Sequence, residues 1–427
     1  MGALLFGAFL ALMLLNIPIA VALGLASMIA LFFGPMATPP LLVVQRMFTA
    51  VDSFPFMAIP FFMLAGGLME GGGISKRLVN FSKTLIGPVP GGLGIITIVS
   101  SAFFGAISGS NPATVASIGG IMIPAMIKAG YPRPYAAAIA AAAGTLGVII
   151  PPSIPMVTYG VVSGCSIGDL FIAGFIPGLS IALLLTLTVL VQARRLGLKG
   201  DRRYSLREIG AAARDALWAL LMPIIVLGGI YGGVFTPTEA AAVAVVYSLI
   251  VGLFVYREFT IKDLPKTLVK AGISTSVVLF VIAASSSFSW LITSARIADT
   301  VTRGMMAISS NPFVLIFLIN LLLLFLGTFL ETQAIILLVA PILIPLAARI
   351  GLEPLALGII MVVNTSVGMI TPPMAVNLFV ACGIADLKIE EITRPILPLL
   401  AVEIAFCLIM SNFSQILTWL PRLIHGF

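Results

Sequence analysis

Two short stretches of this 427-residue chain interrupt strongly apolar sequence with glycine, proline and hydroxyl residues. Residues 144–155 read GTLGVIIPPSIP, and residues 365–373 read TSVGMITPP. Proline removes a backbone donor from a helix and clashes with the preceding turn, which leaves carbonyl oxygens unpaired. Unpaired polar groups are costly in an apolar environment. We therefore expect ligands at both breaks, with carbonyl oxygens binding a cation and half-helix N-termini facing an anion.

Each broken stretch is accompanied by a polar segment in the middle of another apolar run. The run at 94–129 contains SGSNPATVASIGG, and the run at 313–350 contains GTFLETQ. These patterns predict two helical hairpins that enter and leave the membrane on the same side. The polar tip residues are Ser108, Ser110, Asn111 and Thr114 in the first hairpin, and Thr328, Glu331, Thr332 and Gln333 in the second. Close helix packing also uses small residues, but two symmetric pairs favour ligand binding.

The types of oxygen ligand suggest which cation these tips would bind. Hydroxyl, amide and carbonyl oxygens without a dense carboxylate cluster suit Na⁺ better than Ca²⁺. Glu331, an acid at a hairpin tip, is a candidate proton carrier or ion ligand. Asp52 is either a third polar contributor or an interfacial helix cap. Glu403 lies in the last apolar segment, and the sequence shows no partner for it.

The amino-acid composition indicates the class of protein in which these helix breaks and polar tips occur. Hydrophobic residues make up 60% of the chain and charged residues only 9%, with a mean hydropathy of +1.18. Apolar runs of this length predict an all-α integral membrane protein and exclude a β-barrel. Three scattered cysteines and one histidine give no metal-ligand spacing, and no phosphate-binding loop occurs. No nucleophile, base and acid converge, so we expect a protein that is not an enzyme.

Basic residues predict the orientation of the chain. The apolar segments are expected at about 2–33, 54–70, 94–129, 134–165, 171–193, 216–235, 239–256, 271–294, 313–350, 354–387 and 395–420. With both hairpins non-crossing, 18 of the 23 Lys and Arg residues lie on one face, which is therefore cytoplasmic. Residues 2–33, too long for a signal peptide, would form the first membrane helix. The N-terminus would then be cytoplasmic and the C-terminus would lie outside.

An internal repeat relates the two halves at an offset of 221 residues. Residues 121–152 align without gaps to residues 342–373, with three prolines and two glycines in register. Hairpins that open toward opposite sides indicate inverted repeats. Because the first copy makes four crossings, a linking helix at 216–235 is needed to invert the second copy. The sequence thus predicts an inverted-repeat transporter with two re-entrant hairpins and two discontinuous helices.

The expected organisation combines a moving transport domain with a scaffold. Its parts are scaffold helices of the first repeat at 1–93, the first hairpin and discontinuous helix at 94–165, scaffold helices at 166–312 with a cytoplasmic connector at 194–215, the second hairpin and discontinuous helix at 313–387, and a C-terminal scaffold helix at 388–427.

Five segments together resemble a known family. They are DSFPFMAIPFFMLAG, FFGAISGSNPATVASIGGIMIPAMIKAGY, GTLGVIIPPS, FTPTEAAAVAVVY and NTSVGMITPPMAVNLF. Over essentially the whole chain this set is similar to the large membrane (transport) subunit of tripartite ATP-independent periplasmic (TRAP) transporters, in the ion transporter superfamily. The resemblance implies an elevator-type secondary importer of organic acids in the bacterial inner membrane, coupled to Na⁺. It also implies a periplasmic substrate-binding protein and a small four-helix membrane subunit. No four-helix extension precedes Met1, so we expect that subunit to be a separate chain.

The resemblance also implies where ions and substrate bind. One Na⁺ site would use Ser108 and Asn111 with carbonyls near Gly147, Ile150 and Pro152. The other would use Thr328 and Thr332 with Gly368, Thr371 and Pro373. The substrate carboxylate would lie between the tips, against Ser110, Asn111, Thr145, Asn364 and Thr365. Because Ile150 aligns with Thr371, the first site lacks one hydroxyl and the two sites are not equivalent.

Two other functions fit the same architecture. A stand-alone Na⁺/dicarboxylate symporter would need no binding protein, so uptake without that protein would reject the tripartite interpretation. A channel with re-entrant hairpins would conduct without a Na⁺ gradient. Observation of saturable Na⁺-driven uptake would therefore exclude a channel. The cargo is open among dicarboxylates, sialic acids and other carboxylates.

Overall fold

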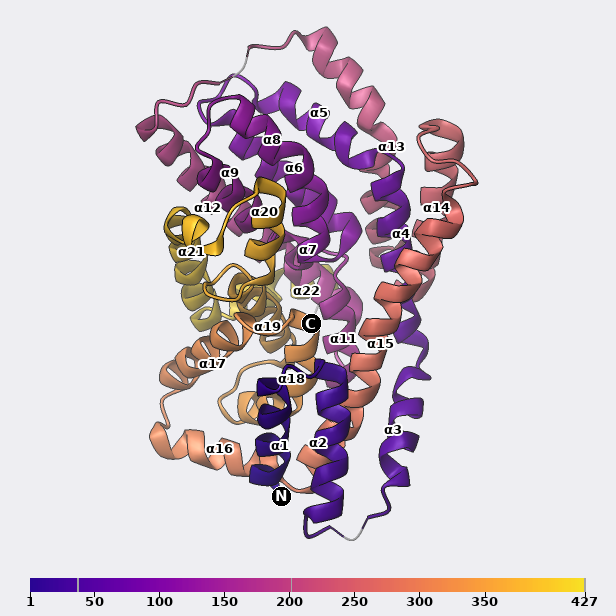
Figure 1. Cartoon of the computed structure of the whole chain (residues 1–427), viewed down its shortest axis with the longest axis vertical. Coiled ribbons are helices and arrows are strands. Elements are labelled where there is room, and N and C mark those ends of the chain that lie inside the picture. The colour runs from indigo at the N-terminus through magenta and orange to yellow at the C-terminus, as the bar shows by residue number, and fades with distance from the viewer. Residues whose placement is uncertain (37, 201, 426–427) are drawn as a thin grey trace.

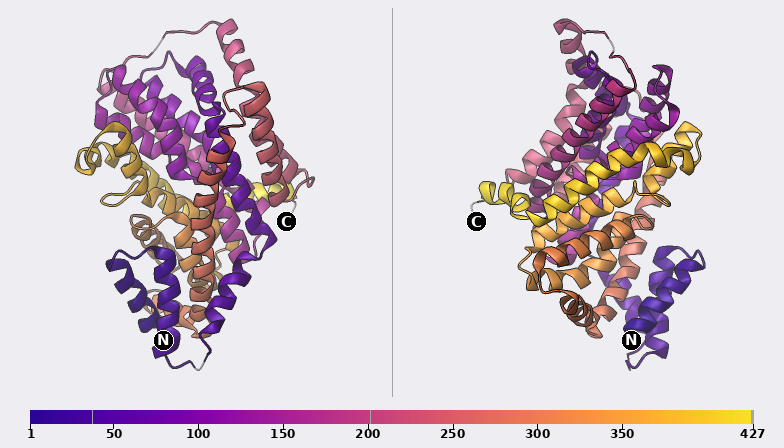
Figure 2. Two further views of the ribbon diagram at one scale, coloured as in Figure 1. Left: turned by 45° about the vertical axis from the view of Figure 1, so that its right-hand side comes forward. Right: turned by 90° about the vertical axis from the view of Figure 1, so that its left-hand side faces the viewer.

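The computed structural model describes residues 1–36, 38–200 and 202–425, and these residues form helices and connections without any β-strand (Figure 1). Eight helices in this part of the chain are long and apolar enough to cross a membrane. The predicted all-α, multi-span fold class is confirmed. Helix α5 (Ile74–Ile86) and the α12–α13 connection lie at one end of the molecule, and the N-terminus and α16 (Ile297–Ile308) lie at the other (Figures 1 and 2).

The first apolar run is not the single membrane helix that its length predicts. It forms two helices, α1 (Gly2–Leu14) and α2 (Ile19–Phe33), which pack against each other. The chain reverses where Asn16 adopts a positive φ of 60° and Pro18 precedes α2. Asn tolerates the left-handed region, and proline cannot continue a helix. The N-terminus therefore lies at the same end of the molecule as the α2–α3 connection (Figure 1).

A group of helices on one side of the molecule surrounds the longest helix. Helix α15 (Leu264–Ser294) packs against α2, α3 (Leu41–Val51) and α4 (Ala58–Gly71). Between α3 and α4 lies the short 3₁₀ helix η1 (Phe54–Met57), and α4 also packs against α14 (Pro237–Ile250). Helix α14 continues as the π-helical turn η3 (Val251–Val255).

Both predicted hairpin regions form helix–turn–helix units. The first comprises α6 (Gly92–Ser108), α7 (Asn111–Thr114), the π-helical turn η2 (Val115–Gly119) and α8 (Gly120–Lys128). The second comprises α17 (Pro312–Gly327) and α18 (Thr332–Arg349). An amphipathic helix precedes each unit, α5 in the first half and α16 in the second.

Both predicted helix breaks occur at the prolines and glycines that suggested them. In the first half the order is α9 (Arg133–Ala143), α10 (Leu146–Ile149) and α11 (Ile154–Ser163); in the second it is α19 (Pro354–Gly368) and α20 (Val376–Ala385). The Pro151–Pro152 and Pro372–Pro373 peptides are both cis. An apolar window within Arg133–Ser163 is 100% buried, against 22% within Leu206–Tyr231. The broken helix is therefore in the protein interior, where neighbouring protein groups can satisfy its backbone.

The remaining helices differ from the expected boundaries in two places. The connector expected at 194–215 is shorter, because α12 (Ile167–Arg195) ends and α13 (Leu206–Tyr231) begins inside that range. A capping box formed by Ser205 and Glu208 starts α13. The C-terminal helix is divided into α21 (Ile389–Asn412) and α22 (Gln415–His425).

The 221-residue offset extends beyond the aligned sequence. Helices α7 and α18 begin at Asn111 and Thr332, and α9 and α19 begin at Arg133 and Pro354. Each half also has a pair of contacting helices before the next helix of its series. In the first half α1 and α2 precede α3, and in the second half α13 and α14 precede α15. The expected linking helix 216–235 lies largely within α13. It therefore has a counterpart in α1 and is not an additional element.

Candidate functional site

The two hairpin tips meet near the middle of the molecule, where Figure 1 shows α7, α11 and α19. A small pocket of about 40 Å³ is lined by Ser110 and Asn111 from the first tip and by Glu331, Thr332 and Gln333 from the second. A space of this size holds a few water molecules at most. The structure thus brings together the polar tips that the sequence singled out.

Asn111 links the first tip to both broken helices. Its side-chain Oδ1 accepts a hydrogen bond from the Val148 N–H at 2.9 Å, and its Nδ2 donates to Ser366 Oγ at 2.7 Å. The side chain is completely buried. Because its oxygen already accepts one bond, Asn111 offers an ion only the remaining lone pair.

Ser366 is a site residue that the sequence analysis missed. Its hydroxyl donates to the Thr145 carbonyl oxygen at 2.8 Å, and it is completely buried. Thr145 and Ser366 are separated by the repeat offset of 221 residues, so the two broken helices touch through equivalent positions. The repeat alignment contained a signal for this pair, because Thr145 and Ser366 each stand two positions before the aligned glycines Gly147 and Gly368.

Oxygen atoms gather where the first tip meets Gly147. Ser108 Oγ lies 3.0 Å from Thr114 Oγ1, and Thr114 Oγ1 donates to the Ser110 carbonyl at 2.8 Å. A Cβ added to Gly147 would lie 2.5 Å from that carbonyl oxygen. Two hydroxyls and one carbonyl are the ligand types expected for Na⁺.

The other members of the expected first ion site lie at its edge. A Cβ on Gly109 would lie 3.2 Å from the Pro152 carbonyl oxygen, which places that oxygen beside the first tip. The Ile150 side chain instead faces Gly178 of α12, since a Cβ there would lie 2.6 Å from Ile150 Cγ1.

The expected second ion site is divided by the structure. Thr328, Thr371 and Pro373 line one hollow of about 460 Å³, whereas Thr332 lines the pocket between the tips. The hydroxyls of Thr328 and Thr371 donate to carbonyls of their own helices at 2.7 and 3.1 Å. Gly368 lies directly against α17 of the second hairpin, since a Cβ on Gly368 would lie 2.5 Å from Gly327 Cα.

Four expected contributors do not line the tip pocket. The side chains of Asn364 and Thr365 donate to carbonyls within α19 at 2.8 and 2.7 Å, and neither residue lines the pocket. Asp52 is exposed at the junction of α3 and η1 and does not cap a helix N-terminus. Thr145 contributes its backbone carbonyl to the contact between broken helices, as described above.

Two polar side chains of the second tip differ in their surroundings. Glu331 is exposed and lines both the small tip pocket and the larger cavity that adjoins it. Gln333 is 6% exposed, and neither its amide nitrogen nor its amide oxygen has a hydrogen-bond partner among the described residues. Because buried amides are normally paired, this side chain is available to a polar ligand in the pocket.

A cavity of about 1020 Å³ adjoins the tips. One end is lined by Ser108, Ser110 and Glu331, and the other by Lys266 and Lys270 near the start of α15. Lys270 Nζ lies 3.5 Å from a carboxylate oxygen of Glu70 on α4. The cavity thus runs from the candidate site to the start of α15 and to the 256–263 connection that precedes it.

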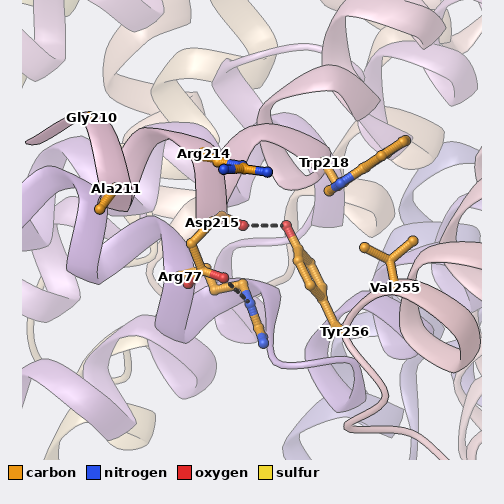
Figure 3. Close-up of a pocket in the computed structure, with 8 residues that line it drawn as sticks. All are labelled: Arg77, Gly210, Ala211, Arg214, Asp215, Trp218, Val255 and Tyr256. Atoms are coloured by element: carbon orange, nitrogen blue, oxygen red, sulfur yellow. Dashed lines mark hydrogen bonds and ion pairs between the residues drawn. The ribbon is translucent and has the colours of Figure 1, made fainter.

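A separate hollow of about 600 Å³ lies around Arg77 on α5 (Figure 3). Arg77 forms ion pairs with Asp215 at 3.3 Å and Glu258 at 2.7 Å, and its guanidinium stacks 3.8 Å from the Tyr256 ring centre. The Tyr256 hydroxyl donates to the Asp215 carbonyl at 2.8 Å. These contacts satisfy Arg77, so we assign this cluster a structural role.

Comparison with known proteins identifies the family. A model for the DctM component of the tripartite ATP-independent periplasmic transporter matches residues 6–416. The chain belongs to this family. It is a membrane-spanning transporter permease, not an enzyme, and its family is one component of a three-part system.

Proteins with TRAP transporter permease names are similar to this chain over most of their length. The chain is 39% identical over 435 residues to the C4-dicarboxylate TRAP transporter large permease protein DctM of Rhodobacter capsulatus, covering 99% of each chain. It is 38% identical over 383 residues to the sialic acid TRAP transporter large permease protein SiaM of Vibrio cholerae, covering 90% of each. It is 44% identical over 413 residues to the isethionate TRAP transporter permease protein DctMQ of Oleidesulfovibrio alaskensis, covering 96% of this chain but 65% of that protein.

A solved structure supports the fold. The YdaH transporter of Alcanivorax borkumensis superimposes with a TM-score of 0.66, covering 95% of this chain and 97% of that one. The sequence identity is 16%, so this likeness shows the fold alone. The expected TRAP resemblance is therefore confirmed by the family match.

Proposed function

We propose that this permease is the translocating subunit of a Na⁺-coupled importer of organic acids, fed by a periplasmic binding protein. The observation that carries the proposal is the meeting of two polar hairpin tips at two broken helices, with the buried Gln333 amide unpaired between them. Discontinuous helices at such a meeting point are where secondary transporters bind substrate and coupling ions.

The cargo class rests on the relatives. Their names specify C4-dicarboxylate, sialic acid and isethionate, which are all organic anions. Hydroxyls, amides and half-helix N-termini are suited to such anions. The 40 Å³ tip pocket is too small for them, so we propose that cargo occupies the adjoining end of the larger cavity.

Sodium coupling rests on the type and spacing of the oxygens. Ser108, Thr114 and the Ser110 carbonyl lie within 3.4 Å of one another beside Gly147. Insertion of a cation would exchange these hydroxyl contacts for ion contacts. The hydroxyls of Thr328 and Thr371, which share a hollow with Pro373, would serve a second ion.

We propose an elevator movement with a larger moving body than the sequence indicated. Helix α12 packs against α6 and α19, and α21 packs against α9 and α19. Both therefore move with the re-entrant hairpins and broken helices. The scaffold comprises α1–α4 and α13–α15, with the two halves inverted in the membrane.

The proposed orientation keeps the basic loops in the cytoplasm. The N-terminus is cytoplasmic in the sequence-based prediction because residues 2–33 count there as one crossing. Since α1 and α2 form an antiparallel pair, we propose instead that the N-terminus lies on the periplasmic side. The C-terminus is proposed to be periplasmic. The cavity lined by Lys266 and Lys270 then opens toward the cytoplasm, as required for release of cargo.

A separate small membrane subunit is the proposed partner in the membrane. Support comes from the coverage of 99% in both directions with a protein named as a large permease. The relative named DctMQ extends well beyond the aligned region, since only 65% of it is covered.

The decisive experiment reconstitutes the chain with its small subunit in liposomes under an inward Na⁺ gradient. Uptake of labelled succinate, N-acetylneuraminate and isethionate is measured with and without the periplasmic binding protein. We expect saturable uptake of at least one of these acids that requires both Na⁺ and the binding protein. Uptake without the binding protein would indicate a stand-alone symporter. Non-saturable flux without Na⁺ would indicate a channel.

A further inference from the structure

Glu403 is an acid in the middle of α21, one of the eight membrane-length helices, and its exposed fraction is 0%. Among the described residues no basic side chain forms an ion pair with it. Its Oε2 atom has no hydrogen-bond partner there. An isolated carboxylate in such a place is very unfavourable, because neither water nor a cation compensates its charge.

The helices packed on α21 supply no compensating charge near Glu403. These are α9, α12, α17, α19 and α20. Their titratable and charged residues all lie in the first or last turn of a helix: Arg133, Tyr135, Asp169, Arg194, Arg195 and Cys382. On α21 itself the neighbour one turn further along is Cys407, which is also 0% exposed. The surroundings of Glu403 therefore favour its neutral form.

The contact with Thr145 supports a proton on Glu403. Thr145 Oγ1 lies 2.7 Å from the Ala142 carbonyl and 3.3 Å from Glu403 Oε1. A hydroxyl has one proton to donate, and the shorter contact to a carbonyl uses it. A protonated Glu403 can then donate to the lone pair of Thr145 Oγ1, which satisfies both contacts at once.

Thr145 connects Glu403 with the first hairpin tip. The Thr145 carbonyl accepts from Ser366 Oγ at 2.8 Å, and Ser366 Oγ accepts from Asn111 Nδ2 at 2.7 Å. Asn111 in turn accepts from the Val148 N–H. Glu403 contacts the Thr145 hydroxyl and Ser366 contacts the Thr145 carbonyl, so the two sets of hydrogen bonds are joined through the Thr145 residue itself and together link α21 to the tip pocket.

We propose that Glu403 is a positioning residue of the substrate site, whose neutral carboxyl group donates to Thr145 and fixes the linked hydrogen bonds that end at Asn111. This rests on the proposed function, because Asn111 lines the pocket assigned to cargo and ions. Counted from the helix start, the matching residue of α12 is the apolar Ile181, so the first half supplies no equivalent group.

The first test detects the proton on the Glu403 carboxyl group by infrared spectroscopy. The infrared spectrum of the complete reconstituted transporter at neutral pH should show the carbonyl stretch of a neutral carboxyl group. That band should disappear in Glu403→Gln and remain in Glu331→Gln. An unchanged band in Glu403→Gln would overturn the proposal. This reading does not depend on transport, so it stands even if the proposed function fails.

The second test measures the KM for uptake, with whichever organic acid is transported in the experiment described under the proposed function. A change in KM reports on the positioning of the substrate site. Glutamine keeps the shape and a donor, so Glu403→Gln should keep KM within about twofold and the same pH profile as wild type. Glu403→Ala should raise KM about tenfold, which corresponds to about 1.4 kcal/mol. A KM for Glu403→Gln as high as that expected for Glu403→Ala would contradict the proposal. A wild-type KM in Glu403→Ala would also contradict it.

A further pair of variants covers the case in which the alanine protein does not fold. Thr145→Ser keeps the hydroxyl and should behave as wild type, whereas Thr145→Val removes it and should raise KM about tenfold. In Thr145→Val, changing Glu403 to alanine as well should add little, because the shared interaction is already lost. Independent, additive effects of the two changes would overturn the proposal.

Discussion

At the scale of single residues, glycines determine how closely each hairpin approaches its broken helix. A Cβ on Gly147 would lie 2.5 Å from the Ser110 carbonyl oxygen and 2.6 Å from Thr114 Oγ1. A Cβ on Gly327 would lie 2.8 Å from Gly368 Cα. Only glycine allows such contact between backbones. The same contacts gather the oxygens that we assign to the ion.

We expect Gly147→Ala to reduce the initial rate of Na⁺-driven uptake at least about tenfold, the effect of about 1.4 kcal/mol. The added methyl group must displace the Ser110 carbonyl and thereby separate the oxygens of the first tip. Uptake in proteoliposomes measures the effect, and a thermal unfolding midpoint shows whether the fold is retained.

The matched control is Gly383→Ala in α20, where a Cβ would meet nothing within 4 Å. This variant should transport as wild type does, because alanine is also a better helix former than glycine. Equal activity of the two alanine variants would show that the close approach at Gly147 does not matter for transport.

At the scale of elements, Arg77 joins α5 to α13 and to the connection that follows η3. Its side chain is 14% exposed and contacts Asp215, Glu258 and Tyr256. Arg77→Ala should lower the free energy of unfolding by about 1 kcal/mol, mainly because the stacking of the guanidinium on Tyr256 is lost. The carboxylates of Asp215 and Glu258 are partly exposed, so their ion pairs contribute little. Arg77→Lys should recover only part of this, since lysine lacks the fork geometry.

Thermal unfolding in detergent, followed by fluorescence, measures the effect of these substitutions. Arg207→Ala serves as the control, because Arg207 is an exposed residue of α13 that forms no hydrogen bond or ion pair with the described residues. If Arg77→Ala and Arg207→Ala lower the unfolding midpoint equally, the cluster does not hold these elements together.

Cross-linking tests the boundary between the proposed scaffold and moving body. Ser289 on α15 donates to the Leu337 carbonyl on α18 at 3.1 Å, which is a contact across that boundary. In a chain without its three native cysteines, cysteines at 289 and 337 should block uptake once a short bifunctional thiol reagent joins them. The block is expected because the elevator movement must separate α15 from α18.

The matched pair lies inside the proposed moving body. Ser411 Oγ on α21 lies 2.8 Å from Asn320 Oδ1 on α17. Cysteines at 320 and 411 should cross-link and leave uptake intact. Loss of uptake in this pair alone would place α21 with the scaffold, as the sequence first suggested.

Elements with a strong local signal were predictable, and elements that depend on distant packing were not. Proline and glycine pairs located both helix breaks, and polar interruptions located both hairpin tips. The turn at Asn16 was missed because apolar length outweighed a single Asn and a nearby Pro18. The grouping of α12 and α21 with the broken helices depends on contacts between residues far apart in sequence.

Residues of the candidate site followed the same rule. Ser108 and Asn111 were predictable from the polar interruption of their apolar run, and Gly147 was predictable from the repeat alignment with Gly368. On α19 the sequence favoured Asn364 and Thr365, whereas Ser366 makes the contact, because a helix turns each side chain by about 100° from the last. Glu403 was visible as an unusual acid, but its contact with Thr145 spans 258 residues.

At the scale of the whole molecule, the large cavity indicates which state the structure represents. It runs from the hairpin tips to the 256–263 connection and to Lys266 and Lys270 near the start of α15, on the face assigned to the cytoplasm. The proposed cycle therefore includes this conformation as the one that releases cargo. An opposite conformation, open toward the binding protein, would arise when the moving body crosses the scaffold.

The most direct measurement of coupling imposes a Na⁺ gradient on the reconstituted three-component system and follows accumulation of the transported acid. We predict that the acid concentrates inside when external Na⁺ exceeds internal Na⁺. Accumulation should collapse with a Na⁺ ionophore and be absent when K⁺ replaces Na⁺. Equal accumulation in Na⁺ and in K⁺ would contradict the claim that the hairpin tips and broken helices bind sodium to drive transport.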